Sequence, residues 1–355
     1  MHYLCSMNNS IKTDIRRLSQ SEIKNFILTI GQPGFRAKQI YEWLWQKGAT
    51  TFDEMTNLPK ELRILLSDHF IIHTIQSDII QNSEDGTIKT RFILHDGNKV
   101  ESVLIPVPAD RRYTLCVSTQ VGCSLACQFC ATGQMRRTRN LDASEIYDQF
   151  VQVNQQCLDT FDHPLTNVVY MGMGEPLLAY SSTMDSIKML TSPEGLNMSP
   201  KRITVSTAGI VKMIYRMADE GVKFNLAISL HAADNEKRSK IMPINNTNKL
   251  EDLIDALQYF YQKTGNKISF EYIAFKNFND SLEDAENLVQ LCKRFPVVVN
   301  IIEYNHVAGV PLEKADDDKI NRFALYLRRN EIMCTVRRSR GKDIDAACGQ
   351  LANKN

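Results

Sequence analysis

The stretch YTLCVSTQVGCSLACQFC, residues 113–130, places an apolar strand pattern directly before three closely spaced cysteines. From here to about residue 338, strand-like segments alternate with helix-like segments in a regular order. Runs such as VVVNII (297–302) are apolar on both faces, which is typical of parallel strands covered by helices. The strand–helix unit recurs about six times, and this pattern predicts an α/β fold, a full or partial (β/α)6 barrel.

Polar residues fall at the predicted carboxyl ends of the barrel strands, the rim at which (β/α) barrels carry out their chemistry. Any one of them is commonly a loop residue without a role, but their recurrence at one register predicts a site. In chain order they are Cys123, Cys127 and Cys130 after the first strand, Gly174 and Glu175 after the second, Ser206 ending the third, Ser229 and His231 ending the fourth, and Asn305 after the sixth.

Two smaller segments precede the barrel. Residues 14–70 carry apolar residues at three- and four-residue intervals, which predicts three helices. Residues 72–106 carry short strand patterns with two Asp-Gly turns, EDGT and HDGN, which favour tight hairpins. The predicted organisation is a helical N-terminal domain (1–71), a β-meander linker (72–108), the core barrel (109–343) and a C-terminal tail (344–355).

The composition is that of a globular protein, since 355 residues of which 43% are hydrophobic can bury a large core. No apolar run is long enough to span a membrane and no secretory signal pattern is present, so we expect a cytoplasmic protein with no membrane partner. Without an export signal, the nine cysteines are expected as thiols or ligands rather than a disulfide framework. A net charge of +1 leaves a nucleic-acid partner open, because basic residues can still gather on one face.

The C-x3-C-x2-C spacing of Cys123, Cys127 and Cys130 indicates a metal centre. A structural zinc site usually has two C-x2-C pairs, and no second pair occurs in this sequence. A 4Fe-4S cluster takes one thiolate per iron, so three cysteines leave one iron open for a substrate or cofactor. S-adenosylmethionine (SAM) can occupy such an iron through its amino and carboxylate groups. Three buried structural cysteines are the least favoured interpretation, because their neighbours are Gly, Ser, Gln and Thr.

This spacing, on the first loop of a predicted partial barrel, resembles the radical SAM superfamily. In that superfamily the cluster reduces SAM to give a 5'-deoxyadenosyl radical, and a GEP-like strand end contacts the SAM amino group. The resemblance therefore assigns Gly174 and Glu175, in MGMGEP, to SAM.

Five further motifs make the resemblance more specific. CATGQ, MGMGEPL, AISLHA, MPIN (242–245) and DIDAACGQL (343–351) closely resemble the radical SAM RNA methyltransferases of the RlmN and Cfr type, over nearly the whole chain. The resemblance implies methylation of an adenine ring carbon in 23S rRNA, and also in tRNA, with two SAM molecules. It also implies an RNA-positioning role for the N-terminal helices, an electron donor such as flavodoxin, and a monomer.

The same resemblance assigns roles to residues outside the cysteine cluster. Cys348 carries the methyl group as methyl-cysteine, and Cys116 releases the product by forming a transient disulfide with it. Glu101, in VESVLIP, removes the ring proton, although the pattern equally fits a strand residue that faces solvent. The expected SAM contacts are Ser206, Ser229, Leu230, His231 and Asn305, with a rim histidine satisfied by the backbone as the alternative for His231.

The remaining choices stay open at this stage. Arg136 and Arg137 stand where the family usually carries a Gly-Phe pair, which predicts an altered loop or added phosphate contacts. The intact GEP motif favours carbon 2 of adenine, and a Cfr-type carbon 8 enzyme is the nearest alternative. A non-catalytic zinc or RNA-binding protein is the remote one. Cys157, Cys292 and Cys334 are expected as buried structural residues, and Cys5 in the N-terminal tail.

Overall fold

The computed structural model describes residues 12–354, so Cys5 lies outside the described residues. The chain divides into two compact units, Met1–Thr74 with Lys188–Asn197, and Ile75–Ile187 with Met198–Asn355. No helix of the described part is long and apolar enough to cross a membrane.

The first unit contains the three helices that the apolar spacing predicts, α1 (Gln20–Thr29), α2 (Arg36–Trp45) and α3 (Lys60–His69). Ser19 and Glu22 form a reciprocal capping box that satisfies the first amides of α1. A short parallel pair, β1 (Thr13–Asp14) and β2 (Phe70–Ile71), joins the two ends of the segment. Tyr41 and Trp45 are buried in this unit, as helical periodicity favours for aromatic residues in α2.

The second unit is built on one ten-stranded sheet with the order β14-β13-β12-β11-β10-β9-β6-β5-β4-β3. Its strands from β6 to β14 run parallel and the remaining three are antiparallel. The bounds are β3 (Gln76–Asn82), β4 (Ile88–Ile93), β5 (Lys99–Val107), β6 (Arg112–Cys116), β9 (Asn167–Tyr170), β10 (Ile203–Thr207), β11 (Asn225–Ser229), β12 (Ile268–Ala274), β13 (Val298–Glu303) and β14 (Cys334–Arg337).

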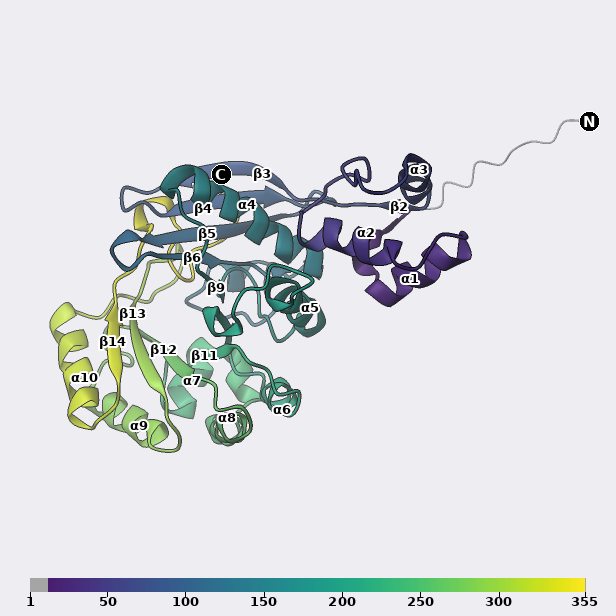
Figure 1. Cartoon of the computed structure of the whole chain (residues 1–355). Helices are drawn as coiled ribbons and strands as arrows, with labels where there is room; N and C mark the ends of the chain where they lie inside the picture. Colours follow the sequence, from purple (N-terminus) through teal and green to yellow (C-terminus); the bar gives the residue numbers. More distant parts are fainter. Residues whose placement is uncertain (1–11, 355) are drawn as a thin grey trace, which may run out of the picture. The chain divides into compact units, whose positions relative to one another are not determined.

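Helices follow the parallel strands and cover the outer side of the curved sheet, as Figure 1 shows for α8, α9 and α10. Every residue of β12 is buried, as expected for a parallel strand covered on both faces, and its two polar residues, Ser269 and Glu271, are hydrogen-bonded to each other. The helix bounds are α4 (Ala143–Phe161), α5 (Tyr180–Thr191), α6 (Val211–Asp219), α7 (Asn235–Ile241), α8 (Leu250–Thr264), α9 (Leu282–Cys292) and α10 (Asp317–Arg329). Within the described residues the sheet ends at β14 and β3 without closing, so the predicted partial barrel is confirmed.

The segment expected as a meander forms β3, β4 and β5, which extend the barrel sheet through the antiparallel β5–β6 pair. Its two tight turns contain Gly86 (φ 84°) and Gly97 (φ 79°), backbone angles that favour glycine. The antiparallel strands are therefore continuous with the strands that carry the candidate site. A second small sheet, β7 (Gln120–Val121) with β8 (Arg139–Asn140), lies beside the cysteine loop.

Candidate active site

The three clustered cysteines lie in the loop that follows β6 and β7, and all three are half-buried. Burial raises the pKa of each thiol, that of Cys123 to about 11. The backbone N–H groups of Leu125, Thr132 and Gly133 act in the opposite direction, because they hydrogen-bond to Cys123 or Cys130 and lower the pKa. The loop thus supplies amide donors to sulfur atoms that would otherwise be costly to ionise.

The three thiols of the loop act on one another electrostatically. The charge of Cys130 acts on both Cys123 and Cys127 and raises their pKa further after burial. Among the described residues, no group of three or more His, Cys, Asp or Glu side chains is arranged to hold a single metal ion. Three separate soft thiolates with amide donors fit a cubane, which binds one thiolate per iron.

The loop is anchored at its start by Gly122, whose φ of 73° favours glycine. A Cβ atom there would lie 2.4 Å from the Arg136 carbonyl oxygen, so the backbone at Gly122 packs against the backbone at Arg136 and leaves no room for a side chain. The Arg136 and Arg137 side chains are exposed, and Arg137 donates to Asn140 Oδ1 at 3.1 Å. The basic pair that departs from the family pattern therefore lies at the surface beside the cysteine loop.

The GEP segment follows β9 and packs directly against Gln120. Gly174 has a φ of 98°, and a Cβ atom there would lie 2.5 Å from Gln120 Cβ. The buried Glu175 carboxylate accepts from Ala208 N at 2.8 Å and from Leu177 N at 3.0 Å. Burial raises the pKa of Glu175, and these amide bonds oppose the rise. The carboxylate links the end of β9 to the end of β10.

His231 follows β11 in the left-handed conformation, with a φ of 56°. Its Nδ1 accepts from Ile273 N at 3.0 Å, so the ring proton is on Nε2. Burial lowers the pKa of His231 to about 3, with a smaller effect of Arg238, and the ring is neutral near pH 7. This contact is the one expected from the alternative interpretation of His231, a rim histidine whose ring is hydrogen-bonded to the backbone.

The other expected SAM contacts lie on neighbouring strand ends. Ser206 is buried near the end of β10, Ser229 ends β11 and Leu230 is fully buried just after it. Asn305 follows β13 and donates to Ser339 Oγ at 2.9 Å. The register predicted from the sequence therefore places these side chains at one rim of the sheet.

The C-terminal tail docks against the cysteine loop. Gly349 O accepts from Ala131 N at 2.7 Å, and Leu351 O accepts from Thr132 Oγ1 at 2.6 Å. The first of these bonds joins the residues that directly follow Cys130 and Cys348 in the sequence. The C-terminal tail and the cysteine loop are thus held side by side.

Cys348 and Cys116 are both free thiols in the structure. Cys348 is exposed to solvent, yet enough protein surrounds it that burial raises its pKa, with a further contribution from Glu271. Cys116 ends β6 and is buried. Burial raises the pKa of Cys116, and the charge of Cys348 raises it further, so the two thiols are close enough to interact.

Glu101 lies within β5 and is buried, so the alternative of a strand residue that faces solvent is wrong. Its Oε2 accepts from Ala352 N at 2.9 Å and from Asn353 N at 3.1 Å. Lys89 Nζ lies 3.7 Å from Oε1 in the same buried environment. Two backbone amides of the C-terminal tail are therefore hydrogen-bonded to the carboxylate that the family resemblance assigns as a base.

Two buried charged residues at the same rim escaped the sequence analysis. Arg238 on α7 is fully buried, and Glu271 on β12 is nearly so. Glu271 Oε1 accepts from Asn300 Nδ2 at 2.7 Å and from Ser269 Oγ at 2.8 Å. The signal for Glu271 was a lone carboxylate in the apolar run ISFEYIAF, whereas nothing in the charged stretch NEKRSK distinguishes Arg238.

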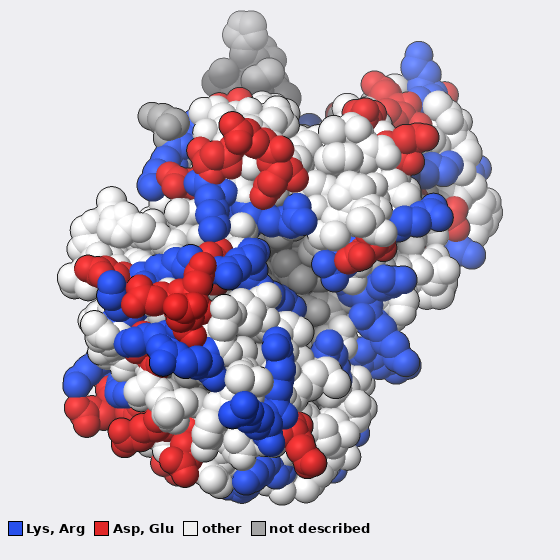
Figure 2. Space-filling view, turned by 90° about the vertical axis from the view of Figure 1, so that its left-hand side faces the viewer, with Lys and Arg blue, Asp and Glu red and all other residues white. Residues whose placement is uncertain are grey.

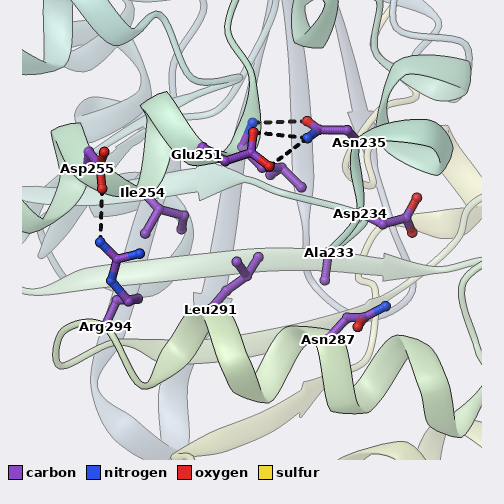
Figure 3. A pocket seen from close by; sticks show the side chains of 10 residues that line it. Ala233, Asp234, Asn235, Glu251, Ile254, Asp255, Asn287, Leu291 and Arg294 are labelled. Atoms are coloured by element: carbon purple, nitrogen blue, oxygen red, sulfur yellow. Dashed lines mark hydrogen bonds and ion pairs between the residues drawn. The ribbon is translucent and has the colours of Figure 1, made fainter.

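A pocket of about 540 Å³ lies between α8 and α9 and is also lined by Ala233, Asp234 and Asn235 at the start of α7 (Figure 3). Its polar groups are paired across the pocket wall, Asn235 with Glu251 at 3.0 Å and Arg294 with Asp255 at 2.9 Å. Figure 2 shows Lys and Arg side chains around a hollow on one face, with Asp and Glu side chains beside them. A net charge of only +1 is therefore compatible with several basic side chains near one hollow.

Comparison with known proteins defines the class of this site. Residues 117–292 match the model of the radical SAM superfamily, and residues 13–72 match that of the ribosomal RNA large subunit methyltransferase N-terminal domain. A crystal structure of a radical SAM methyltransferase from Sphaerobacter thermophilus is 40% identical, with a TM-score of 0.89 over 96% of this chain and 100% of that one. The chain is therefore a radical SAM enzyme, and this superfamily implies a 4Fe-4S cluster and SAM.

Two full-length relatives narrow the class to a family. A probable dual-specificity RNA methyltransferase RlmN from Christiangramia forsetii is 52% identical over 99% of both chains. One of the same name from Salinibacter ruber is 44% identical over 97% of this chain and 95% of its own. The chain belongs to the RlmN family of radical SAM RNA methyltransferases. This membership contradicts the alternative of a non-catalytic zinc protein.

Proposed function

We propose that the protein methylates carbon 2 of an adenosine in 23S rRNA and in tRNA, with Cys348 as the methyl carrier. The observation that carries this proposal is the docking of the Cys348 tail on the cysteine loop, through the 2.7 Å bond between Ala131 N and Gly349 O. The printed names of the relatives, dual-specificity RNA methyltransferases, support the two RNA classes.

Cys123, Cys127 and Cys130 would hold the cluster, and Gly174, Glu175, Ser206, Ser229, Leu230, His231 and Asn305 would contact SAM. When bound, the cluster and SAM supply the methyl group and the radical chemistry that an electron-poor ring carbon requires. The amide donors to the cysteine sulfurs and the glycine at position 174 support this assignment. The electron donor would be a flavodoxin-like protein.

The residues of the chain itself would act in a fixed order. The Cys348 thiolate would accept a methyl group, and the radical chemistry would remove one hydrogen atom from it, so that its carbon can bond to carbon 2 of the adenine while Glu101 accepts the ring proton. Cys116 would then attack the Cys348 sulfur and break the bond between this sulfur and the transferred carbon. That carbon takes up a proton to become the methyl group of the product, the two cysteines form a disulfide, and the one electron released would pass to the cluster. An external reductant must restore both thiols before the next cycle. The electrostatic coupling of the two thiols supports their pairing.

The docked tail adds a condition to this order. Because the amides of Ala352 and Asn353 both bind Glu101 Oε2, the tail end must leave Glu101 before that oxygen accepts a ring proton. Movement of the tail between docked and released positions is therefore part of the proposed cycle.

The test is a reaction of the anaerobically reconstituted protein with SAM, a reductant and either a 23S rRNA fragment or tRNA. Nucleoside mass spectrometry should find 2-methyladenosine in both RNAs, and peptide mass spectrometry should find a methyl group on Cys348. Cys348→Ala, which keeps the cluster ligands, is the matched control and should give neither. Formation of 8-methyladenosine instead would support the Cfr-type alternative and overturn the carbon 2 assignment.

A further inference from the structure

Arg238 lies on α7 with no exposed surface, directly before the MPIN segment. Asp234 caps this short helix by accepting from Lys237 N at 2.8 Å, which fixes the turn that carries Arg238. Burial lowers the pKa of Arg238 to about 10, so the guanidinium remains positively charged near pH 7.

The guanidinium donates four hydrogen bonds, and each goes to a neutral oxygen. Nη2 donates to Ala208 O at 2.6 Å and to Ser229 O at 3.2 Å, and Nε donates to Leu230 O at 3.1 Å. Nη1 donates to Asn245 Oδ1 at 2.9 Å, within the MPIN motif. The Arg238 side chain therefore connects the carboxyl ends of β10 and β11 to each other and to the segment after α7 through hydrogen bonds.

The fastened backbone includes the segment that Glu175 also holds. Ala208 N donates to the Glu175 carboxylate at 2.8 Å, while Ala208 O accepts from Arg238. At the end of β10, Ala208 is thus hydrogen-bonded to a buried carboxyl group through its N–H and to a buried guanidinium through its carbonyl. These bonds hold the chain just after Thr207, where the pairing of β10 with β11 stops.

Arg238 also lies close to the cysteine loop. Gln128 N, next to Cys127, donates to Ile241 O on the helix that carries Arg238, at 3.0 Å. Cys127 and Cys130 pack against a buried apolar cluster that contains Ala208 and Ile241. Among the described residues no carboxylate lies within ion-pair distance of Arg238, so its buried charge has no protein counter-ion, which is a costly arrangement.

We propose that Arg238 is a positioning residue for SAM and the counter-charge of the cysteine loop. Its four bonds fix the ends of β10 and β11 where SAM would bind, and its charge balances the anionic cluster that the three thiolates would hold. This inference rests on the proposed function and deepens it, because it gives the MPIN motif a role through Asn245.

The experiment compares Arg238→Lys with Arg238→Met in the anaerobically reconstituted protein. Lysine keeps the charge but lacks the planar fork, so SAM should bind about ten- to a hundredfold more weakly, the effect of losing a hydrogen bond to a charged group. Methionine removes charge and bonds together, so SAM binding should weaken similarly and the midpoint potential of the cluster should also fall. The potential should fall because a nearby positive charge favours the more negative, reduced cluster.

The readouts are equilibrium dialysis with labelled SAM and potentiometric titration followed by electron paramagnetic resonance. Hydrogen exchange of the cluster-free protein at residues 206–209 and 226–231 reports the positioning role without the cofactor, and both variants should exchange faster there. Arg16→Lys and Arg16→Met are controls, because Arg16 is also buried but lies in the other unit. They should leave SAM affinity within about twofold of wild type, since they remove none of these bonds.

Wild-type SAM affinity in Arg238→Met would overturn the positioning role, and an unchanged potential would overturn the counter-charge role. If Arg238→Met does not fold, Asn245→Asp replaces it, because a carboxylate beside Nη1 neutralises the charge while keeping the bond. That variant should lower the potential, and a wild-type potential would refute the inference. If wild-type protein itself fails to bind SAM, the proposed function fails, whatever the variants do.

Discussion

Replacing Glu101 by glutamine should loosen the C-terminal tail. Glu101 Oε2 accepts two backbone hydrogen bonds, from Ala352 N at 2.9 Å and Asn353 N at 3.1 Å. Bonds to an ionised acceptor contribute about 1.5–3 kcal/mol each and neutral ones about 0.5–1.5 kcal/mol. Glutamine keeps a neutral acceptor of the same shape, so docking of the tail should weaken by about 1–3 kcal/mol in total. Buried Lys89 also loses its carboxylate partner, which acts in the same direction.

Hydrogen exchange read by mass spectrometry on the C-terminal peptide measures this change. A loss of about 1–3 kcal/mol should speed exchange at Ala352 and Asn353 about 5- to 150-fold. Asn353→Gly is the matched control, because glycine also adopts the φ of 55° found at this position, and the change removes the side-chain bond from Nδ2 to Lys99 O at 2.8 Å while it keeps both amides on Glu101. Exchange in Glu101→Gln within about twofold of wild type, or slower than in Asn353→Gly, would refute the electrostatic account of docking.

The same variant tests the catalytic assignment of Glu101. Methylation of Cys348 should proceed, since it needs no ring proton to be removed, but turnover should stall with RNA linked to the protein. Denaturing gel electrophoresis with labelled RNA would detect the linked species. A full yield of methylated RNA from Glu101→Gln would remove Glu101 from the mechanism, even if tail exchange accelerates as expected.

Three further changes test other parts of the site. Gly174→Ala should destabilise the protein by at least about 1–2 kcal/mol in urea unfolding and weaken SAM binding, because the Cβ atom would lie 2.5 Å from Gln120 Cβ at a φ of 98°; unchanged stability would exclude this packing. Burial raises the pKa of Glu303, but its lysine contacts outweigh burial and lower the pKa from 4.5 to about 2, so the stability it adds is present above pH 4.5 and lost as pH falls toward 2. Glu303→Gln should therefore lose at most about 3 kcal/mol of unfolding free energy near pH 7, less in salt, and the difference from wild type should shrink below about pH 4; a pH-independent difference would contradict the assignment. Reversing the charges of Arg136 and Arg137 should flatten the slope of log affinity for RNA against log salt by about 0.7 to 0.9 per lost phosphate contact, and an unchanged slope would exclude phosphate contacts there.

The barrel and its rim could be predicted from the sequence because both depend on local pattern. Apolar runs define β12 and β13, and the Asp-Gly turns define the hairpins before them. The register of parallel strands then brings residues such as Ser206 and Ser229 to one edge without further information. The cysteine loop could also be recognised from local sequence, since its three cysteines fall within eight residues.

The contacts that could not be predicted join residues far apart in the chain. The bonds from Ala352 and Asn353 to Glu101 span about 250 residues, and no periodicity specifies such a contact. Glu101 fits a solvent-facing strand pattern equally well, and only the arrival of the tail and the pairing of β5 with β6 bury it. Arg238 was missed for a different reason, because three of its four acceptors are backbone carbonyls, which leave no trace in the side-chain sequence.

The tail must dock firmly enough to present Cys348 and loosely enough to free Glu101. Two separate sets of hydrogen bonds hold the tail, one to the cysteine loop and one to Glu101. Gly349 O and Leu351 O, both just after Cys348 in the chain, accept from the cysteine loop at 2.7 and 2.6 Å, while Ala352 and Asn353 share one carboxylate oxygen. The two sets of bonds share no donor and no acceptor, so residues 352–353 can release while the segment at Gly349 stays docked. Release of residues 352–353 alone would expose Glu101 while Cys348 stays beside the cysteine loop, so the proposed cycle needs only partial undocking of the tail.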